Sequence, residues 1–251
     1  MIDRETLVSF AKLNGMRPWQ QERHYVQSVA LVALSDYPLV FKGGTYLWFF
    51  HGLNRFSEDL DFTASGALPA DLPEKISRAL ELFGVENSLK KITDDERSLS
   101  FRLSAKGPLN SSAIDLCHVY AEISRREDVA RAALSLSFNF DAYQLPTKIV
   151  AGMSLDEVAA EKVRAIYSRD KARDLYDLFF LVGKKNAVFD LQLANDKLGF
   201  YGLGFSASEF AEKVAEKKAV WKKELEPLVF GELPEFARVQ EQVLAWANKA
   251  L

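Results

Sequence analysis

Apolar residues in the first part of the chain predict two helices, then two short strands with a third helix between them. They recur at helical spacing up to Gly15, which ends the first helix, and again over Pro18–Leu34. The run Leu39–Phe41 is short and wholly apolar, as in a buried strand, and Tyr46–Phe50 follows as an apolar helix. Polar and apolar residues then alternate over Asp59–Phe62, which indicates a second strand.

The middle of the chain predicts one more helix and a set of antiparallel strands. Apolar positions over Leu72–Phe83 have helical spacing, after a polar link that contains proline and glycine. Ser98–Ala105 alternates strictly, and after a Lys-Gly-Pro turn the chain returns over Ser112–Tyr120, so these two segments predict a hairpin. Leu134–Phe140 alternates again and is expected to form another strand.

From about Ser154 onward the pattern becomes helical. Ser154 and Glu157 have the spacing of a capping box, in which each side chain satisfies a free N–H at a helix start. Gly183 is expected to end the second of the helices that follow. Four helices are predicted here, over Asp156–Tyr167, Arg173–Val182, 206–224 and 234–251. We therefore expect two domains, a sheet-containing core over residues 1–150 and a helical domain over 151–251.

Composition and charge narrow the class of protein. The chain has 251 residues, of which 48% are hydrophobic, so it can bury a substantial core. The formal net charge is −3, and a nucleic-acid partner would therefore have to meet a local basic patch. Cys117 is the single cysteine and lies in an apolar run, which favours a core position. The chain begins without a signal-peptide pattern, and no apolar run is long enough to span a membrane, so we expect a cytoplasmic protein.

A glycine pair directly after the first predicted strand is a candidate phosphate site. Gly43 and Gly44, followed by Thr45, stand where a strand turns into a helix. Glycines allow the backbone to approach a phosphate closely, and the free N–H groups at a helix start face it. Such a pair alone is often only a turn. Lys42 precedes the glycines and either reaches a phosphate or lies in solvent.

The second predicted strand carries a candidate metal site. Strand side chains alternate, so Asp59 and Asp61 lie on one face and Leu60 on the other. Two carboxylates on one face can hold magnesium or manganese, which take oxygen ligands and share substrate phosphates. Asp115, in the predicted strand 112–120, is a candidate third carboxylate, as a general base or second-metal ligand. It is equally consistent with an ordinary polar strand-face residue.

These motifs together resemble those of a known superfamily. Residues 41–45 (F-K-G-G-T) and 55–62 (R-F-S-E-D-L-D-F) resemble the motif of polymerase-beta-type nucleotidyltransferases. Their full sequences resemble those of one branch, the AbiEii/AbiGii toxin family of type IV toxin–antitoxin systems. Residues 160–162 (A-E-K) and 173–178 (R-D-L-Y-D-L) resemble two further family elements. The resemblance implies an α/β (α+β) fold, with a polymerase-beta-type nucleotidyltransferase core around a mixed sheet and a helical C-terminal domain.

The resemblance also implies residue roles in the helical part. It transfers catalytic roles to Lys162 and to Asp174 or Asp177, with the lysine binding the triphosphate as a point charge. If so, the Lys162 amine should lie on the order of 10 Å from the Asp59 carboxylate, within reach of one shared ligand. Two alternatives are open: in one, Asp177 only pairs with Arg173, four residues earlier on the helix, and in the other, Lys162 is a surface residue paired with Asp156 or Asp170.

The resemblance further implies a reaction and its partners. An acceptor hydroxyl would attack the α-phosphate of a nucleoside triphosphate (NTP), with pyrophosphate leaving, and in some members the acceptor is the 3′ end of tRNA. A cognate antitoxin is expected. In part of the family an antitoxin kinase phosphorylates the serine at the position of Ser57, and the alternative is that Ser57 is an ordinary loop serine. Basic residues over 162–173, together with Lys184 and Lys185, either guide an RNA end or form a solvated helix face. Two rival functions are nucleotide transfer to a protein hydroxyl and nucleotide-binding regulation without turnover.

Overall fold

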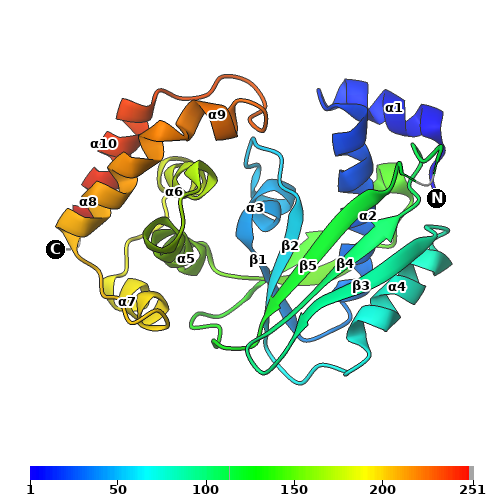
Figure 1. The fold of residues 1–251 in the computed structure, drawn as a ribbon, viewed down its shortest axis with the longest axis horizontal. Helices are drawn as coiled ribbons and strands as arrows, with labels where there is room; N and C mark the ends of the chain where they lie inside the picture. The colour runs from blue at the N-terminus through cyan, green and yellow to red at the C-terminus, as the bar shows by residue number, and fades with distance from the viewer. Residues whose placement is uncertain (113, 249–251) are drawn as a thin grey trace. The chain divides into compact units, whose positions relative to one another are not determined.

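The computed structural model describes residues 1–112 and 114–248, and it divides the chain into two compact units (Figure 1). The sheet unit comprises residues 1–50, 57–129 and 133–152. The helical unit comprises 51–56, 130–132 and everything described after residue 152. A single boundary near residue 150 does not anticipate the two short segments that join the helical unit.

The sheet unit is built on one mixed sheet of seven strands, in the order β3-β4-β5-β2-β1-β7-β6. Strand β2 runs parallel to β5, and β1 runs parallel to β7, whereas the other neighbours are antiparallel. The strands are Leu39–Lys42 (β1), Asp59–Ala64 (β2), Asn87–Asp94 (β3), Ser98–Ala105 (β4), Cys117–Ser124 (β5), Leu134–Phe138 (β6) and Lys148–Gly152 (β7). The predicted mixed α/β architecture is confirmed.

Helices cover one face of this sheet at β5 and β3. The helices of the sheet unit are Arg4–Leu13 (α1), Pro18–Leu34 (α2), Gly43–His51 (α3) and Leu72–Leu82 (α4), with a short 3-10 turn at Asp141–Tyr143. Helix α2 packs against β5 and α4 against β3 (Figure 1). The buried residues Leu99, Phe101 and Leu103 on β4 alternate with the more polar Ser98, Ser100 and Arg102. Because strand side chains alternate, the apolar set lies on the helix-covered face and the polar set on the other.

The helical unit is assembled around α5 and α6. Its elements are Leu155–Ser168 (α5), Ala172–Lys184 (α6), Leu191–Gly199 (α7), Ala207–Glu216 (α8), the 3-10 turn Lys217–Ala219, Trp221–Leu225 (α9) and Phe236–Ala247 (α10). Helix α5 packs against α6, α7 and α8, and α6 also contacts α9 and α10 (Figure 1). Within the described residues, no helix has the length and apolar character that crossing a bilayer would require.

Several predicted elements differ from the structure. Strands β3 and β7 and helix α7 were not predicted, and the predicted helix over 206–224 is broken into α8, a 3-10 turn and α9. The end of the predicted last helix, residues 249–251, lies outside the described residues. Gly183 does not end α6, which continues to Lys184. A β-carbon at Gly183 would lie 2.5 Å from the amide nitrogen of the Gln242 side chain on α10, so the end of that side chain occupies the space beside this glycine.

The predicted capping box at the start of α5 is only half correct. The Ser154 hydroxyl accepts a hydrogen bond from the Glu157 amide, as expected of an N-cap. The Glu157 carboxylate, which is fully buried, does not return to the cap. It accepts hydrogen bonds from the amides of Ala130 and Arg131, each at 3.0 Å, and pairs with Lys197 at 2.7 Å. Glu157 therefore anchors the segment 130–132 to the helical unit.

Candidate functional site

The predicted turn from strand to helix lies at the glycine pair. Strand β1 ends at Lys42, and α3 begins at Gly43, whose φ of +77° is disfavoured for residues with a side chain. A β-carbon at Gly43 would lie 2.2 Å from an oxygen of the Asp61 carboxylate. The absence of a side chain at Gly43 therefore lets the Asp61 carboxylate lie directly against the start of α3.

A buried hydroxyl links α3 to β2, the strand of the predicted metal site. Thr45 is fully buried, and its hydroxyl donates a hydrogen bond of 2.5 Å to the carbonyl oxygen of Asp59. On the preceding segment, the buried Gln27 amide donates to the carbonyl oxygens of Ser57 and Glu58 at 3.2 and 2.8 Å. Ser57 itself is half-buried. These bonds fix the beginning of β2 relative to both helices.

The two aspartates of β2 share one face of the strand. Asp59 and Asp61 are half-buried, whereas Leu60 and Phe62 are buried, as the alternation predicted. Two oxygen-donor side chains suit Mg²⁺, which proteins often bind through one or two carboxylates together with substrate phosphates. Among the described residues, no group of three or more His, Cys, Asp or Glu side chains is arranged to hold a metal. The donor set therefore fits an ion that a phosphate substrate helps to bind.

The prediction that Asp115 lies on a strand beside this pair is wrong. Strand β5 begins only at Cys117, and Asp115 is exposed in the preceding loop, where its carboxylate accepts hydrogen bonds from Ser111 and Ser112 at 2.6 and 2.8 Å. These bonds hold the pKa of Asp115 below its ordinary value. The short polar side chains of this segment satisfy one another locally and so stabilise a loop.

A different acidic residue occupies the strand position next to Asp61. In the parallel pairing of β2 with β5, Asp61 is the register partner of Glu122, and Asp59 is the partner of Tyr120. Register partners point to the same face of a sheet, so Glu122 lies on the face that carries both aspartates. The Glu122 side chain is exposed. Only the register identifies Glu122, because its sequence neighbourhood differs little from any other amphipathic strand.

Lys42 is neither solvated nor unpaired. Its side chain is buried, and its ammonium lies 3.0 Å from the carboxylate of Glu127, which is also buried. Lys42 is the register partner of Asp61 on the neighbouring antiparallel strand. The lysine thus belongs to a buried ion pair within the sheet unit.

The predicted catalytic residues of the helical part lie together. The ammonium of Lys162 on α5 is 3.0 Å from Asp174 and 2.6 Å from Asp177, both on α6. The two aspartates are fully buried, and Lys162 is nearly so. Lys162 is therefore not a surface residue, and the alternative that pairs it with Asp156 or Asp170 is wrong.

Two arginines complete this cluster, and one of them is far away in the sequence. Arg55, from the segment 51–56, is buried and donates through Nε and Nη2 to the two oxygens of Asp177, each at 2.6 Å. Arg169 makes a similar paired contact to Asp174, at 2.8 and 2.9 Å. No local pattern in the sequence points to Arg55. The partners of Asp177 are Arg55 and Lys162, rather than the Arg173 of the predicted alternative.

The charges of the cluster control its protonation. Burial acts to raise the pKa of both aspartates, but the neighbouring cations outweigh it and hold both pKa values below the ordinary range. Arg55 and Lys162 act on Asp177, and Lys162 and Arg169 act on Asp174. Both carboxylates are therefore charged at neutral pH.

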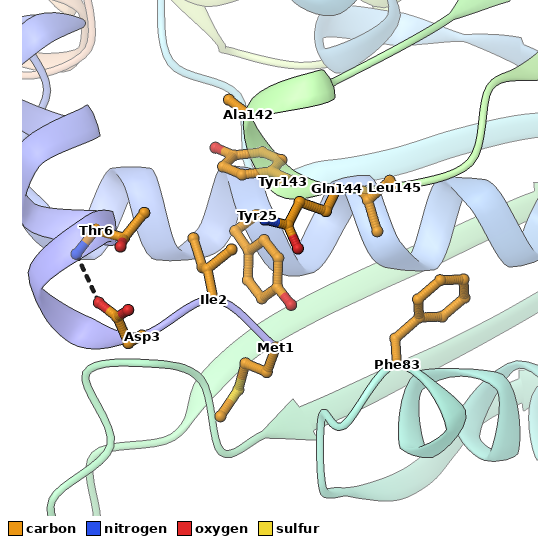
Figure 2. A pocket seen from close by; sticks show the side chains of 10 residues that line it. All are labelled: Met1, Ile2, Asp3, Thr6, Tyr25, Phe83, Ala142, Tyr143, Gln144 and Leu145. Atoms are coloured by element: carbon orange, nitrogen blue, oxygen red, sulfur yellow. Dashed lines mark hydrogen bonds between the residues drawn. The ribbon is translucent and has the colours of Figure 1, made fainter.

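The sheet unit also contains a pocket that none of these residues lines (Figure 2). It has a volume of about 330 Å³. Its walls come from the N-terminal residues, from Tyr25 and Phe83, and from the segment 142–145 around Tyr143 (Figure 2). The Tyr143 hydroxyl is already hydrogen-bonded to His24 and Gln21. Neither the glycine pair nor the aspartate strand contributes to this pocket.

Comparison with known proteins agrees with the motifs. Residues 29–246 match the family model described as nucleotidyl transferase AbiEii toxin, type IV toxin–antitoxin system. JHP933 from Helicobacter pylori has a similar structure, with a TM-score of 0.61, 20% identity, and coverage of 92% of this chain and 90% of that chain. MenT4, a nucleotidyltransferase toxin from Mycobacterium tuberculosis, has a TM-score of 0.63, 20% identity, and coverage of 98% and 89%. No curated protein sequence matches the chain significantly.

Proposed function

Because the chain belongs to the AbiEii family of nucleotidyltransferase toxins of type IV toxin–antitoxin systems, we propose that it transfers a nucleoside monophosphate from an NTP to the 3′ end of an RNA, with tRNA as the expected acceptor. The family also implies an antitoxin as partner. One observation carries the proposal: the Asp61 carboxylate lies against the start of α3 at Gly43. A helix start binds phosphate and a carboxylate binds metal, so one bound triphosphate could use both.

Each part of this site has a role in binding the nucleotide. Asp59 and Asp61 would hold a magnesium or manganese ion, which when bound neutralises the charge of the phosphates. The backbone N–H groups of Gly43 and Gly44 would donate to phosphate oxygens at the positive end of α3. Thr45 would act indirectly, because its hydroxyl holds Asp59 through the backbone.

Glu122 takes the role first expected of Asp115. As the register partner of Asp61, it would accept the proton of the acceptor hydroxyl. In the transfer step, the acceptor oxygen forms a bond to the α-phosphorus and the bond from that phosphorus to the pyrophosphate oxygen breaks. The hydroxyl proton passes to the Glu122 carboxylate, and pyrophosphate leaves with the bonding electrons.

We assign the Lys162 ammonium to the triphosphate and Asp174 to the orientation of that lysine, as the family resemblance implies. The short contact between the two side chains supports the second assignment. The variant Lys162→Gln is expected to lose transfer even where its circular dichroism spectrum is unchanged. Arg169→Gln is the matched control, since it also removes a cation from Asp174 but leaves Lys162 in place.

A labelling experiment tests the function. The protein is incubated with each α-labelled NTP in turn, with magnesium or manganese, total RNA and an acceptor-free control. Label in RNA is expected, and Asp61→Asn should remove it. Label in protein instead would establish the rival acceptor, and no label with any NTP would refute nucleotide transfer.

A further inference from the structure

A row of side chains leads across the sheet from the metal-site strand. Strand register pairs Asp59 with Tyr120 on β5, Tyr120 with Arg102 on β4, and Arg102 with Lys90 on β3. Register partners share a face, so these four side chains lie side by side on the face that α2 and α4 leave uncovered at β5 and β3. With about 4.8 Å between strands, the row extends roughly 14 Å from the Asp59 backbone.

Three members of this row have no partner in the described part of the protein. The side chains of Tyr120, Arg102 and Lys90 make no hydrogen bond or ion pair with the described residues. The Nε atom of Arg102 is shielded from solvent and is still without an acceptor there. Lys90 is exposed, and the other two side chains are half-buried. A shielded donor without an acceptor is costly unless a ligand provides one.

Neighbouring cations on the same strands are already neutralised. Lys91 points to the opposite face, where it pairs with Glu74 at 3.2 Å, and Lys106 pairs with Glu86. His118, on the open face, bonds to Ser104 at 3.0 Å, and burial together with the nearby Arg102 lowers its pKa. Glu122 is the one carboxylate that faces the row from β5. Beyond β5 the open face therefore carries net positive charge.

We propose that this row is the path of the acceptor RNA, with its terminal base stacked on Tyr120 and the preceding phosphates on Arg102 and Lys90. The inference rests on the proposed function and adds to it the residues that would hold the acceptor. An aromatic ring followed by cations is the arrangement that binds single-stranded nucleic acid. It leads to Asp59, so a strand bound along the row presents its 3′ hydroxyl next to the metal-site carboxylates.

Binding of a fluorescein-labelled, single-stranded oligoribonucleotide of about 12 nucleotides tests the row without requiring turnover. Anisotropy is measured over a range of NaCl concentrations for the wild type and each variant. Lys90→Gln and Arg102→Gln should each weaken binding and reduce the slope of log K against log salt by about 0.7 for each phosphate that the variant no longer neutralises. Lys91→Gln is the matched control, with the same charge change on the opposite face, and should bind like the wild type.

The aromatic position is tested separately. Tyr120→Ala should weaken binding by about 5- to 150-fold at every salt concentration without changing the slope, whereas Tyr120→Phe should stay near the wild type.

Equal effects of Lys90→Gln and Lys91→Gln, or no salt-dependent binding, would overturn the inference. If RNA labelling continues with an unchanged KM for RNA in Lys90→Gln/Arg102→Gln, the row is refuted and the proposed function stands. If the wild type labels no RNA, the proposed function fails. The salt slopes of oligoribonucleotide binding then still show whether the row binds RNA.

Discussion

Removing the charge of Asp177 should destabilise the helical unit strongly. Asp177→Asn keeps the shape of the side chain but replaces a carboxylate that contacts Arg55 through two hydrogen bonds and Lys162 through a third contact. All three side chains are buried, so water cannot replace the missing acceptor. The Arg55 guanidinium would then be a buried cation without its counter-ion.

The magnitude follows from the burial of the pair. Breaking a buried ion pair by removing one partner costs roughly 3–5 kcal/mol, whereas an exposed pair contributes about 0–1 kcal/mol. Asp170→Asn is the matched control, since 83% of the Asp170 side chain is exposed and its buried partner Lys217 keeps a second acceptor, the carbonyl oxygen of Arg169, at 2.9 Å. The double variant Arg55→Met/Asp177→Leu removes both charges and should recover most of the loss, because a buried pair replaced by apolar residues is often close to neutral.

Urea unfolding measures the free energy of unfolding of each variant, and hydrogen exchange of α5 and α6 peptides shows where the protein is destabilised.

The stabilisation by Asp177 also depends on pH. The pKa of Asp177 is lowered in the folded protein from an ordinary value of 3.8, so its contribution is complete above that value and is lost as the pH falls through the folded pKa. The difference between wild type and Asp177→Asn should therefore be constant near neutral pH and shrink in acid. A loss no larger than that of Asp170→Asn would refute a buried network.

Four further variants test the sheet unit, and two of them have a matched control. Asp59→Asn and Asp61→Asn should each abolish transfer in the labelling assay while the circular dichroism spectrum stays unchanged, since amides hold magnesium poorly. Gly43→Ala should abolish NTP binding in calorimetry because its β-carbon would overlap Asp61, whereas Gly52→Ala, with the same φ of +77° but no neighbour within 4 Å, should show only a backbone cost of about 1–2 kcal/mol. Glu122→Gln should lower kcat with little change in KM, whereas Asp115→Asn, in the exposed loop, should leave both unchanged. Equal rates in the last two variants would contradict the assignment of Glu122.

Local sequence patterns were sufficient to predict the helices and strands that have strong hydrophobic periodicity. Helix α2 has the predicted bounds, and the turn at Gly43 and the alternation of Asp59, Leu60 and Asp61 are as predicted. These features depend on neighbours in the sequence. The prediction for Asp115 failed because an acidic residue between two apolar ones has the pattern of a strand although it lies in a loop. The residue beside Asp61 is Glu122, which only the long-range pairing of β2 with β5 shows.

Long-range partners could not be predicted from one sequence. Arg55 bonds to a residue 122 positions later, and the Glu157 carboxylate reaches back to residues 130 and 131. Both contacts join segments that no periodicity relates. They also explain why the change between the units is not a single boundary.

The assignment of residues 51–56 to the helical unit has a consequence for synthesis on the ribosome. This segment connects the glycine turn to the aspartate strand, yet its partners are translated much later. Arg55 bonds to Asp177, and the Phe56 amide donates to the carbonyl oxygen of Leu228. At about 5–20 residues per second, the interval before Asp177 is translated is roughly 6–24 s. The nascent chain therefore contains both the glycine turn and the aspartate strand well before the connection between them can fold, and that connection is complete only after residue 228 has been translated.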